Sequence, residues 1–347
     1  MLSGFIYLVL ANYDKAIEEA RTGMELAPDS GFFYVDMGEN SLYMGLLNNS
    51  EEALRKAAER KIENPLLLVL QYDLAFTKGD RARMQQAVKA AQGKPDSMDW
   101  MADRRAFASA YAGQLHQART LSHQAIELAQ QQGDRERAAV FAVRAALWEA
   151  FFGNARAAKQ TATTALGLAR NREVSYGAAV TMALAGESRQ AESLAADLES
   201  NYPEDTSVRF NYLPVIRAIL ALRHSDPAKA IEILEIASPY ELGTPRSACT
   251  GYFGSLYPIL IRGEAYLAAH KGAEAEREFQ KLIDHRGIMI GDSVSSLAHY
   301  GLARSYVLTG EAAKAREQFK LALDTWKDAD LDLPILHEVK AQYANLQ

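Results

Sequence analysis

Hydrophobic positions recur at helical spacing along the chain, and one short phrase repeats where the pattern is interrupted. In this phrase a glycine is followed by four residues and then by an alanine that opens an amphipathic segment. It occurs as Gly113/Ala118, Gly153/Ala158, Gly186/Ala191 and Gly310/Ala315, with Gly79/Met84 as a variant, while Ala16, Ala53, Ala230 and Ala275 head similar segments without the glycine. The nine segment starts are 37, 31, 34, 40, 33, 39, 45 and 40 residues apart. This spacing predicts pairs of helices that repeat along the whole chain.

Three units carry further matching positions. They are Gly4, Tyr7, Ala16, Ala20 and Pro28 in the first, Gly263, Tyr266, Ala275 and Phe279 in the eighth, and Ala303, Tyr306, Ala315, Phe319 and Ala322 in the ninth. On these residues each unit resembles a tetratricopeptide repeat. The glycine permits the left-handed conformation that ends the first helix, and the alanine lets two helix backbones approach while the bulky residue fills the gap.

The predicted fold is all-α: an α–α superhelix, or solenoid, of about nine helix hairpins plus a C-terminal capping helix. We expect the repeat array over residues 1–325 and the cap over residues 326–347, with Asp332 as the N-cap and Pro334 in the first turn of the last helix. Met1 falls inside the first predicted helix, which leaves the array without a cap at its start. We therefore expect the chain to be the C-terminal region of a longer protein.

Composition excludes several classes of function. The net charge is −6, and the basic residues are spread along the chain, so nucleic acid is not an expected partner. The single cysteine, Cys249, rules out an internal disulfide and a cysteine-based zinc site. No stretch reaches the roughly 18 to 20 apolar residues of a membrane-spanning helix. The apolar run 5–10 has no basic residue before it and no cleavage-like site after it, so we do not interpret it as a signal peptide.

Candidate catalytic groups do not form a pattern. The seven histidines are scattered, and His116 and His123 are seven residues apart, too far for one ion to bridge on a helix. The triplet 284–286 (Asp-His-Arg) is expected to cap a helix, Cys249 beside Thr250 and Gly251 is expected to be an inert thiol, and Ser255 lacks a nucleophile elbow. We predict no catalytic residue, no cofactor and no metal ion.

The last third also resembles the C-terminal repeat region of bacterial eukaryotic-type serine/threonine protein kinases. The stretches that carry this resemblance are Pro-Tyr-Glu-Leu-Gly at 239–243, Leu-Tyr-Pro at 256–258, Arg-Gly-Glu-Ala-Tyr-Leu at 262–267, Glu-Phe-Gln-Lys at 278–281, Asp-His-Arg-Gly at 284–287, Trp-Lys-Asp-Ala-Asp at 326–330 and Pro-Ile-Leu at 334–336. The resemblance implies an upstream kinase domain, often a membrane-spanning segment, and a sensory or scaffolding role for these repeats. No glycine-rich phosphate loop, His-Arg-Asp or Asp-Phe-Gly motif occurs in this chain, so we predict that it is not itself an enzyme.

The first helix of each unit is expected to line the inner wall of the superhelix. Ten wall positions are candidates for binding a partner: Phe32, Glu39, Asp73, Phe76, Trp100, Asp103, Phe107, Glu264, Tyr300 and Arg304. Some tetratricopeptide domains hold acidic C-termini with a Lys/Asn clamp, but Glu39, Asp73 and Glu264 stand where that clamp has asparagine. The predicted ligand is therefore an extended protein or peptide segment with basic and apolar side chains.

Other readings of the same pattern stay open. Half of the wall residues could simply pack on neighbouring repeats. The array could instead form a homodimer that brings attached kinase domains together, or it could hold a small molecule in a closed apolar pocket. The sequence does not decide on which side of a membrane the chain works.

Overall fold

A computed structural model describes residues 2–244 and 253–346, which form nineteen α-helices and no strand. Met1, Cys249, Thr250 and Gly251 lie outside the described residues. The first eighteen helices form nine consecutive hairpins: α1 (Leu2–Val9) with α2 (Tyr13–Leu26), α3 (Gly31–Tyr43) with α4 (Leu47–Glu59), α5 (Pro65–Thr77) with α6 (Arg81–Ala91), α7 (Pro95–Tyr111) with α8 (Leu115–Gln131), α9 (Arg135–Phe151) with α10 (Ala155–Leu168), α11 (Arg172–Leu184) with α12 (Ser188–Asn201), α13 (Leu213–Arg223) with α14 (Pro227–Leu234), α15 (Tyr257–Ala268) with α16 (Gly272–Asp284), and α17 (Ser293–Thr309) with α18 (Ala312–Thr325). A last helix, α19 (Pro334–Ala344), follows them. The predicted all-α solenoid is confirmed.

Three short segments interrupt the hairpin pattern. The π-helical turn η1 (Val208–Tyr212) leads into α13, and the 3-10 turns η2 (Glu235–Ala237) and η3 (Arg286–Met289) follow α14 and α16. His285, from the predicted capping triplet, is the C-cap residue of α16. Pro334 stands in the first turn of α19 as predicted, but the N-cap residue is Leu333 and not Asp332.

The turn inside most hairpins contains one residue in the left-handed conformation. The predicted glycines take it, with φ of 73° at Gly113 and 79° at Gly310. Where the glycine is missing, another residue adopts the same conformation, with φ of 57° at Ala11, 59° at Ser225 and 56° at His270. A side chain with a Cβ costs about 1 kcal/mol or more in this conformation, so hairpin packing holds these three turns.

In the second hairpin the predicted repeat register is wrong by three residues. Its left-handed turn residue is Gly45, with φ of 70°, and the small buried residue five positions later is Ser50, which is 0% exposed. The predicted start, Ala53, lies one helical turn further along α4. With Ser50 in place, the first four starts, at residues 16, 50, 84 and 118, are each 34 residues apart. The tetratricopeptide period is therefore kept without insertions in this part of the chain.

Packing between hairpins places large side chains against glycines. The Phe279 ring, which is 0% exposed, lies between Gly263 of its own hairpin and Gly301 of the next. A Cβ added at Gly301 would stand 2.2 Å from Phe279 Cε1, and one at Gly263 would stand 2.9 Å from Cζ. Both glycines therefore leave room for the ring.

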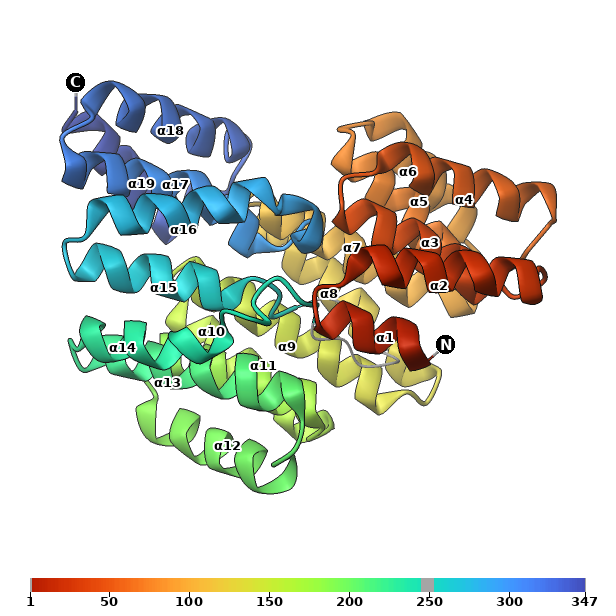
Figure 1. Ribbon diagram of the computed structural model, residues 1–347, viewed down its shortest axis with the longest axis horizontal. Helices are drawn as coiled ribbons and strands as arrows, with labels where there is room; N and C mark the ends of the chain where they lie inside the picture. The colour runs from red at the N-terminus through yellow and green to blue at the C-terminus, as the bar shows by residue number, and fades with distance from the viewer. Residues whose placement is uncertain (1, 245–252, 347) are drawn as a thin grey trace.

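The superhelix closes on itself: the connecting segments between its C-terminal helices lie against its N-terminal hairpins (Figure 1). The Thr244 amide donates to the Leu8 carbonyl at 3.0 Å, at the end of α1. The Trp326 indole donates to the Tyr111 carbonyl at 3.2 Å, and the Asp330 amide donates to the Gly113 carbonyl at 3.1 Å. These contacts join residues more than 200 positions apart, so the C-terminal part of the array packs against its N-terminal part.

Side chains from the two ends of the closed array fill much of its inner face. One hydrophobic cluster combines residues of α7, α8 and α9 with residues of α17, α18 and α19, and it includes Phe107, Trp148, Tyr300, Phe319 and Trp326. Aromatic rings meet edge to face across it, with centroids 5.8 Å apart for Phe107 and Trp148 and 5.9 Å for Phe152 and Trp326. The middle of the array and its C-terminal end therefore share one core.

Candidate functional site

Most of the ten predicted wall residues lie inside this closed array. Glu39, Asp73, Asp103, Phe107 and Tyr300 are each between 0% and 6% exposed. Phe76, Trp100, Glu264 and Arg304 are half-buried, and Phe32 on α3 is 51% exposed. The structure does not bring the ten residues together as one open surface, and their part in binding a partner stays a prediction.

Wall carboxylates pair with arginines of the next hairpin. Asp73 on α5 accepts two hydrogen bonds from Arg104 on α7, at 3.0 and 2.7 Å. Asp103 on α7 accepts a hydrogen bond from Arg144 on α9 through its Oδ2 atom, and neither side chain of this second pair is exposed. These two predicted contact points for a basic ligand thus already have a cation of the protein beside them.

The pattern returns at the C-terminal end. Glu264 on α15 accepts a hydrogen bond from Arg304 on α17 at 2.9 Å. The Arg304 guanidinium also lies 5.2 Å from the centre of the Tyr300 ring. The Tyr300 hydroxyl donates to Glu338 on α19 at 2.6 Å. These three wall residues therefore help to hold α15, α17 and α19 together.

Burial raises the pKa of three buried acids, two of which are predicted wall residues. Burial raises the pKa of Asp73 and Asp103, and the arginine beside each opposes this effect. Burial also raises the pKa of Asp292, at the start of α17, to about 6, although the Val294 amide and the Tyr257 hydroxyl oppose it. An ionised Asp292 is consequently a cost to the fold near neutral pH.

An open groove lies between α5, α6 and α7, beside the turn that leads into α8. Its volume is about 630 Å³, within the range of small-ligand and peptide sites. Tyr72, Phe76, Met84, Val88 and Ala108 form its apolar floor, and we call it the α6–α7 groove. Met84 stands where most units have alanine, so a longer apolar side chain lines the groove at this position.

Cations surround this floor. Arg81, Lys89 and Arg105 line the α6–α7 groove, and none of the three has an ion-pair partner among the residues that the structure describes. Asp328, from the segment between α18 and α19, is the one acid among the described lining residues. The groove therefore combines an apolar floor with excess positive charge on a chain whose net charge is negative. It contains one predicted wall residue, Phe76.

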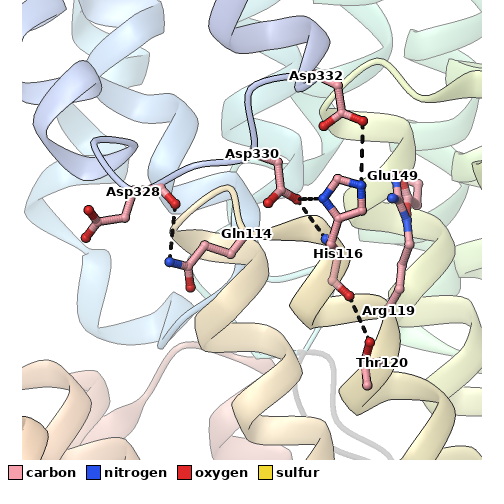
Figure 2. Close-up of polar contacts among 8 residues, drawn as sticks. All are labelled: Gln114, His116, Arg119, Thr120, Glu149, Asp328, Asp330 and Asp332. Carbon is pink, nitrogen blue, oxygen red and sulfur yellow. Dashed lines mark hydrogen bonds and ion pairs between the residues drawn. The ribbon is translucent and has the colours of Figure 1, made fainter.

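A second polar cluster was missed from the sequence. His116, near the start of α8, meets Asp330 and Asp332 from the α18–α19 connection, and one ligand atom from each lies within 4.8 Å of the others (Figure 2). His116 and His123 had been compared only with each other, along one helix. The acidic partners lie 214 or more positions away, so spacing along the chain could not reveal this cluster.

The chain is an all-α solenoid of helix hairpins. No protein-family model matches it, and no curated protein sequence matches it. It is similar to a solved tetratricopeptide repeat protein from Parabacteroides merdae ATCC 43184, with 17% identity and a TM-score of 0.45 over 79% of this chain and 98% of that chain. Yeast Tom70 is 13% identical, with a TM-score of 0.37 over 99% of this chain and 94% of that chain. The TPR domain of P58(IPK) is 15% identical, with a TM-score of 0.28 over 99% and 96%.

Similarities this distant say nothing of a ligand, and the fold class rests on the helix pairs themselves. None of the helices in the described part of the chain combines the length and the apolar character that crossing a bilayer requires.

Proposed function

We propose that the chain is a protein-interaction scaffold that binds an extended segment of a partner protein in the α6–α7 groove. The observation that supports this proposal is the half-buried apolar floor at Phe76, Met84 and Val88, bordered by cations that have no ion-pair partner in the described part of the chain. Apolar side chains of a ligand would be removed from water on this floor, and acidic side chains would face Arg81, Lys89 and Arg105. The ligand we expect is therefore apolar and acidic.

This ligand differs from the basic segment expected from the sequence. That expectation depended on open wall carboxylates, whereas Asp73, Asp103 and Glu264 face arginines of the chain. Phe76 is the wall residue that the proposal uses as an anchor, and its ring also packs edge to face on Tyr111 at 5.4 Å. Phe32 remains a second exposed anchor on α3.

The wider context is part of the same proposal. We propose that the scaffold is the arm of a larger signalling protein, and the stretches between residues 239 and 336 that resemble kinase C-terminal regions support an attached serine/threonine kinase. The full coding sequence tests this point, because a kinase domain upstream would contain His-Arg-Asp and Asp-Phe-Gly motifs. A homodimer that joins two kinase domains is the alternative, and light scattering over a dilution series would reveal a mass twice that of one chain.

Peptide selection tests the groove. A displayed library of random peptides is selected on the full chain, and the affinity of enriched peptides is measured by fluorescence anisotropy. We expect peptides with apolar and acidic residues. Met84→Glu and Arg105→Glu should each weaken binding at least about tenfold, because one places a charge on the floor and the other reverses a charge at the rim.

The matched control is Arg156→Glu, which makes the same charge change at an exposed position of α10. It should leave the affinity unchanged apart from screening by salt. If the selected peptides bind Arg105→Glu and Met84→Glu as tightly as the parent, while circular dichroism shows all variants folded, the α6–α7 groove is not the binding site.

A further inference from the structure

The connection between α18 and α19 places two carboxylates against the first turn of α8 (Figure 2). The Asp330 Oδ2 atom accepts a hydrogen bond from the His116 backbone amide at 2.7 Å, and it lies 2.9 Å from His116 Nδ1. This one carboxylate oxygen therefore contacts both the first turn of the helix and the imidazole ring, and it orients the ring. A neutral ring that donates its Nδ1 proton to Asp330 has the lone pair on Nε2 free to bind a metal ion.

The second ring nitrogen of His116, Nε2, points to another carboxylate. Asp332 Oδ2 lies 3.6 Å from His116 Nε2, which is too long for a good hydrogen bond. Two ligands of one tetrahedral ion, each about 2.1 Å from the metal, stand roughly 3.4 Å apart. The separation of Nε2 and Oδ2 is thus close to that of two ligands of a single cation. Both side chains are largely exposed, 62% for His116 and 71% for Asp332, so water can fill the remaining positions.

Local charge favours a cation at this point. The hydrogen bonds to Glu149, at 2.6 and 2.9 Å, raise the pKa of Arg119 on the same helix, and the charges of Asp332 and Asp330 add a smaller part. Arg119 and Glu149 therefore offset each other, and two carboxylates and one imidazole remain. A divalent ion would neutralise this negative charge, which the N-terminus of α8 only partly offsets.

We propose that His116 Nε2 and Asp332 bind a divalent transition-metal ion of the zinc class, with Asp330 orienting the imidazole and water completing the coordination. The nitrogen ligand favours Zn²⁺ over Mg²⁺ or Ca²⁺, which prefer oxygen. Such an ion links α8 to the α18–α19 connection across 214 positions of the chain, at a contact that closes the superhelix. It adds a cross-link that only the closed array can form, so it stabilises closure. This inference does not depend on the α6–α7 groove.

Isothermal titration calorimetry with Zn²⁺ on the untagged full chain tests the site. We expect one ion per chain in the parent, binding at least about tenfold weaker in His116→Ala and in Asp332→Asn, and weaker binding in Asp330→Asn through loss of ring orientation. Zn²⁺ should also raise the melting temperature of the parent but not that of His116→Ala. Mg²⁺ should do neither.

His123→Ala is the matched control, because His123 is exposed on the same helix and lies away from both aspartates. It should bind Zn²⁺ as the parent does. The proposal is overturned if the parent shows no stoichiometric Zn²⁺ binding. It is equally overturned if His116→Ala and Asp332→Asn keep the parent's affinity, because the ion then lies elsewhere on the surface.

Discussion

Gly301→Ala tests whether the fit of Phe279 between two glycines holds the last hairpins together. A Cβ at residue 301 would stand 2.2, 2.3 and 2.5 Å from three atoms of the Phe279 ring. The ring cannot retreat freely, because Gly263 lies on its other side and the side chain is fully buried. Overpacking of this kind costs about 1 to 3 kcal/mol.

The same change also has a favourable part. Alanine is a better helix former than glycine by up to about 1 kcal/mol in a helix interior. Because three ring atoms would stand within 2.5 Å of the added Cβ, we take the overpacking cost from the upper part of its range, about 2 to 3 kcal/mol. The net loss for Gly301→Ala is therefore about 1 to 2 kcal/mol, which corresponds to a factor of roughly 5 to 30 in the local opening equilibrium. Repeat arrays often unfold in parts, so a local observable is preferable to a global melt. Hydrogen exchange of the α16 and α17 amides should accelerate by that factor.

Gly167→Ala on α10 is the control, because an added Cβ there meets nothing within 4 Å. It should leave exchange unchanged or slow it. Combining Gly301→Ala with Phe279→Leu should cost less than the two single changes together, since the smaller side chain makes room for the methyl group. The reasoning is refuted if Gly301→Ala exchanges no faster than Gly167→Ala.

Three further changes probe packing, pH and ion pairing. Ala158→Leu, at a position that is 0% exposed, should lower stability by about 1 to 3 kcal/mol in a thermal melt, and an unchanged melt would contradict the repeat register. The pKa of Asp292 rises to about 6 on folding, so its ionisation costs stability above pH 6 and this cost is relieved as the pH falls toward 4. Urea titrations should show the parent gaining about 2 to 3 kcal/mol relative to Asp292→Asn between pH 7 and pH 4, and parallel curves would exclude this linkage. Arg144→Met should cost about 3 to 5 kcal/mol in urea by leaving Asp103 buried without this partner, and adding Asp103→Leu should recover most of the loss.

The sequence was sufficient for the hairpins because their determinants are local. A glycine at the turn and an alanine five residues later act within a single hairpin, so they are visible as a repeat. The register failed at Ser50, because serine is nearly as small as alanine and fills the same position without matching the pattern. Gly45, five residues before it, was the signal that could have corrected the register.

The wall was harder to predict for a physical reason. The sequence correctly placed carboxylates such as Asp73 on the first helix of each unit, but their partners lie one repeat further along, as Arg104 does. Closure depends on the small rotation between successive hairpins, which accumulates over the whole array. A contact such as that between Trp326 and Tyr111, 215 positions apart, is therefore not encoded in any local pattern.

Several stretches between residues 239 and 336 lie at the closure. Gly243 lies against the Val9 carbonyl and Gly287 against the carbonyls of Leu42 and Tyr43, and a Cβ at either glycine would stand 2.1 to 2.6 Å from the nearest of these backbone atoms. The stretch 326–330 docks on the turn after α7. The packing of a closed array therefore requires Gly243 and Gly287 to lack a side chain, and it uses the stretch 326–330 as a contact surface.

The closure contacts follow the order of the chain. The ends of α1, α3 and α5 meet residues 243, 287 and 291, and the turns after α7 and α9 meet residues 329 and 334. The C-terminal links therefore run alongside the row of N-terminal turns, as one superhelical turn stacks on another. An open solenoid is stabilised only between neighbouring repeats, whereas this row couples hairpins several repeats apart. Because Asp328 and Gln114 belong both to the closure and to the lining of the α6–α7 groove, a ligand seated in that groove would contact two hairpins and the link that closes them.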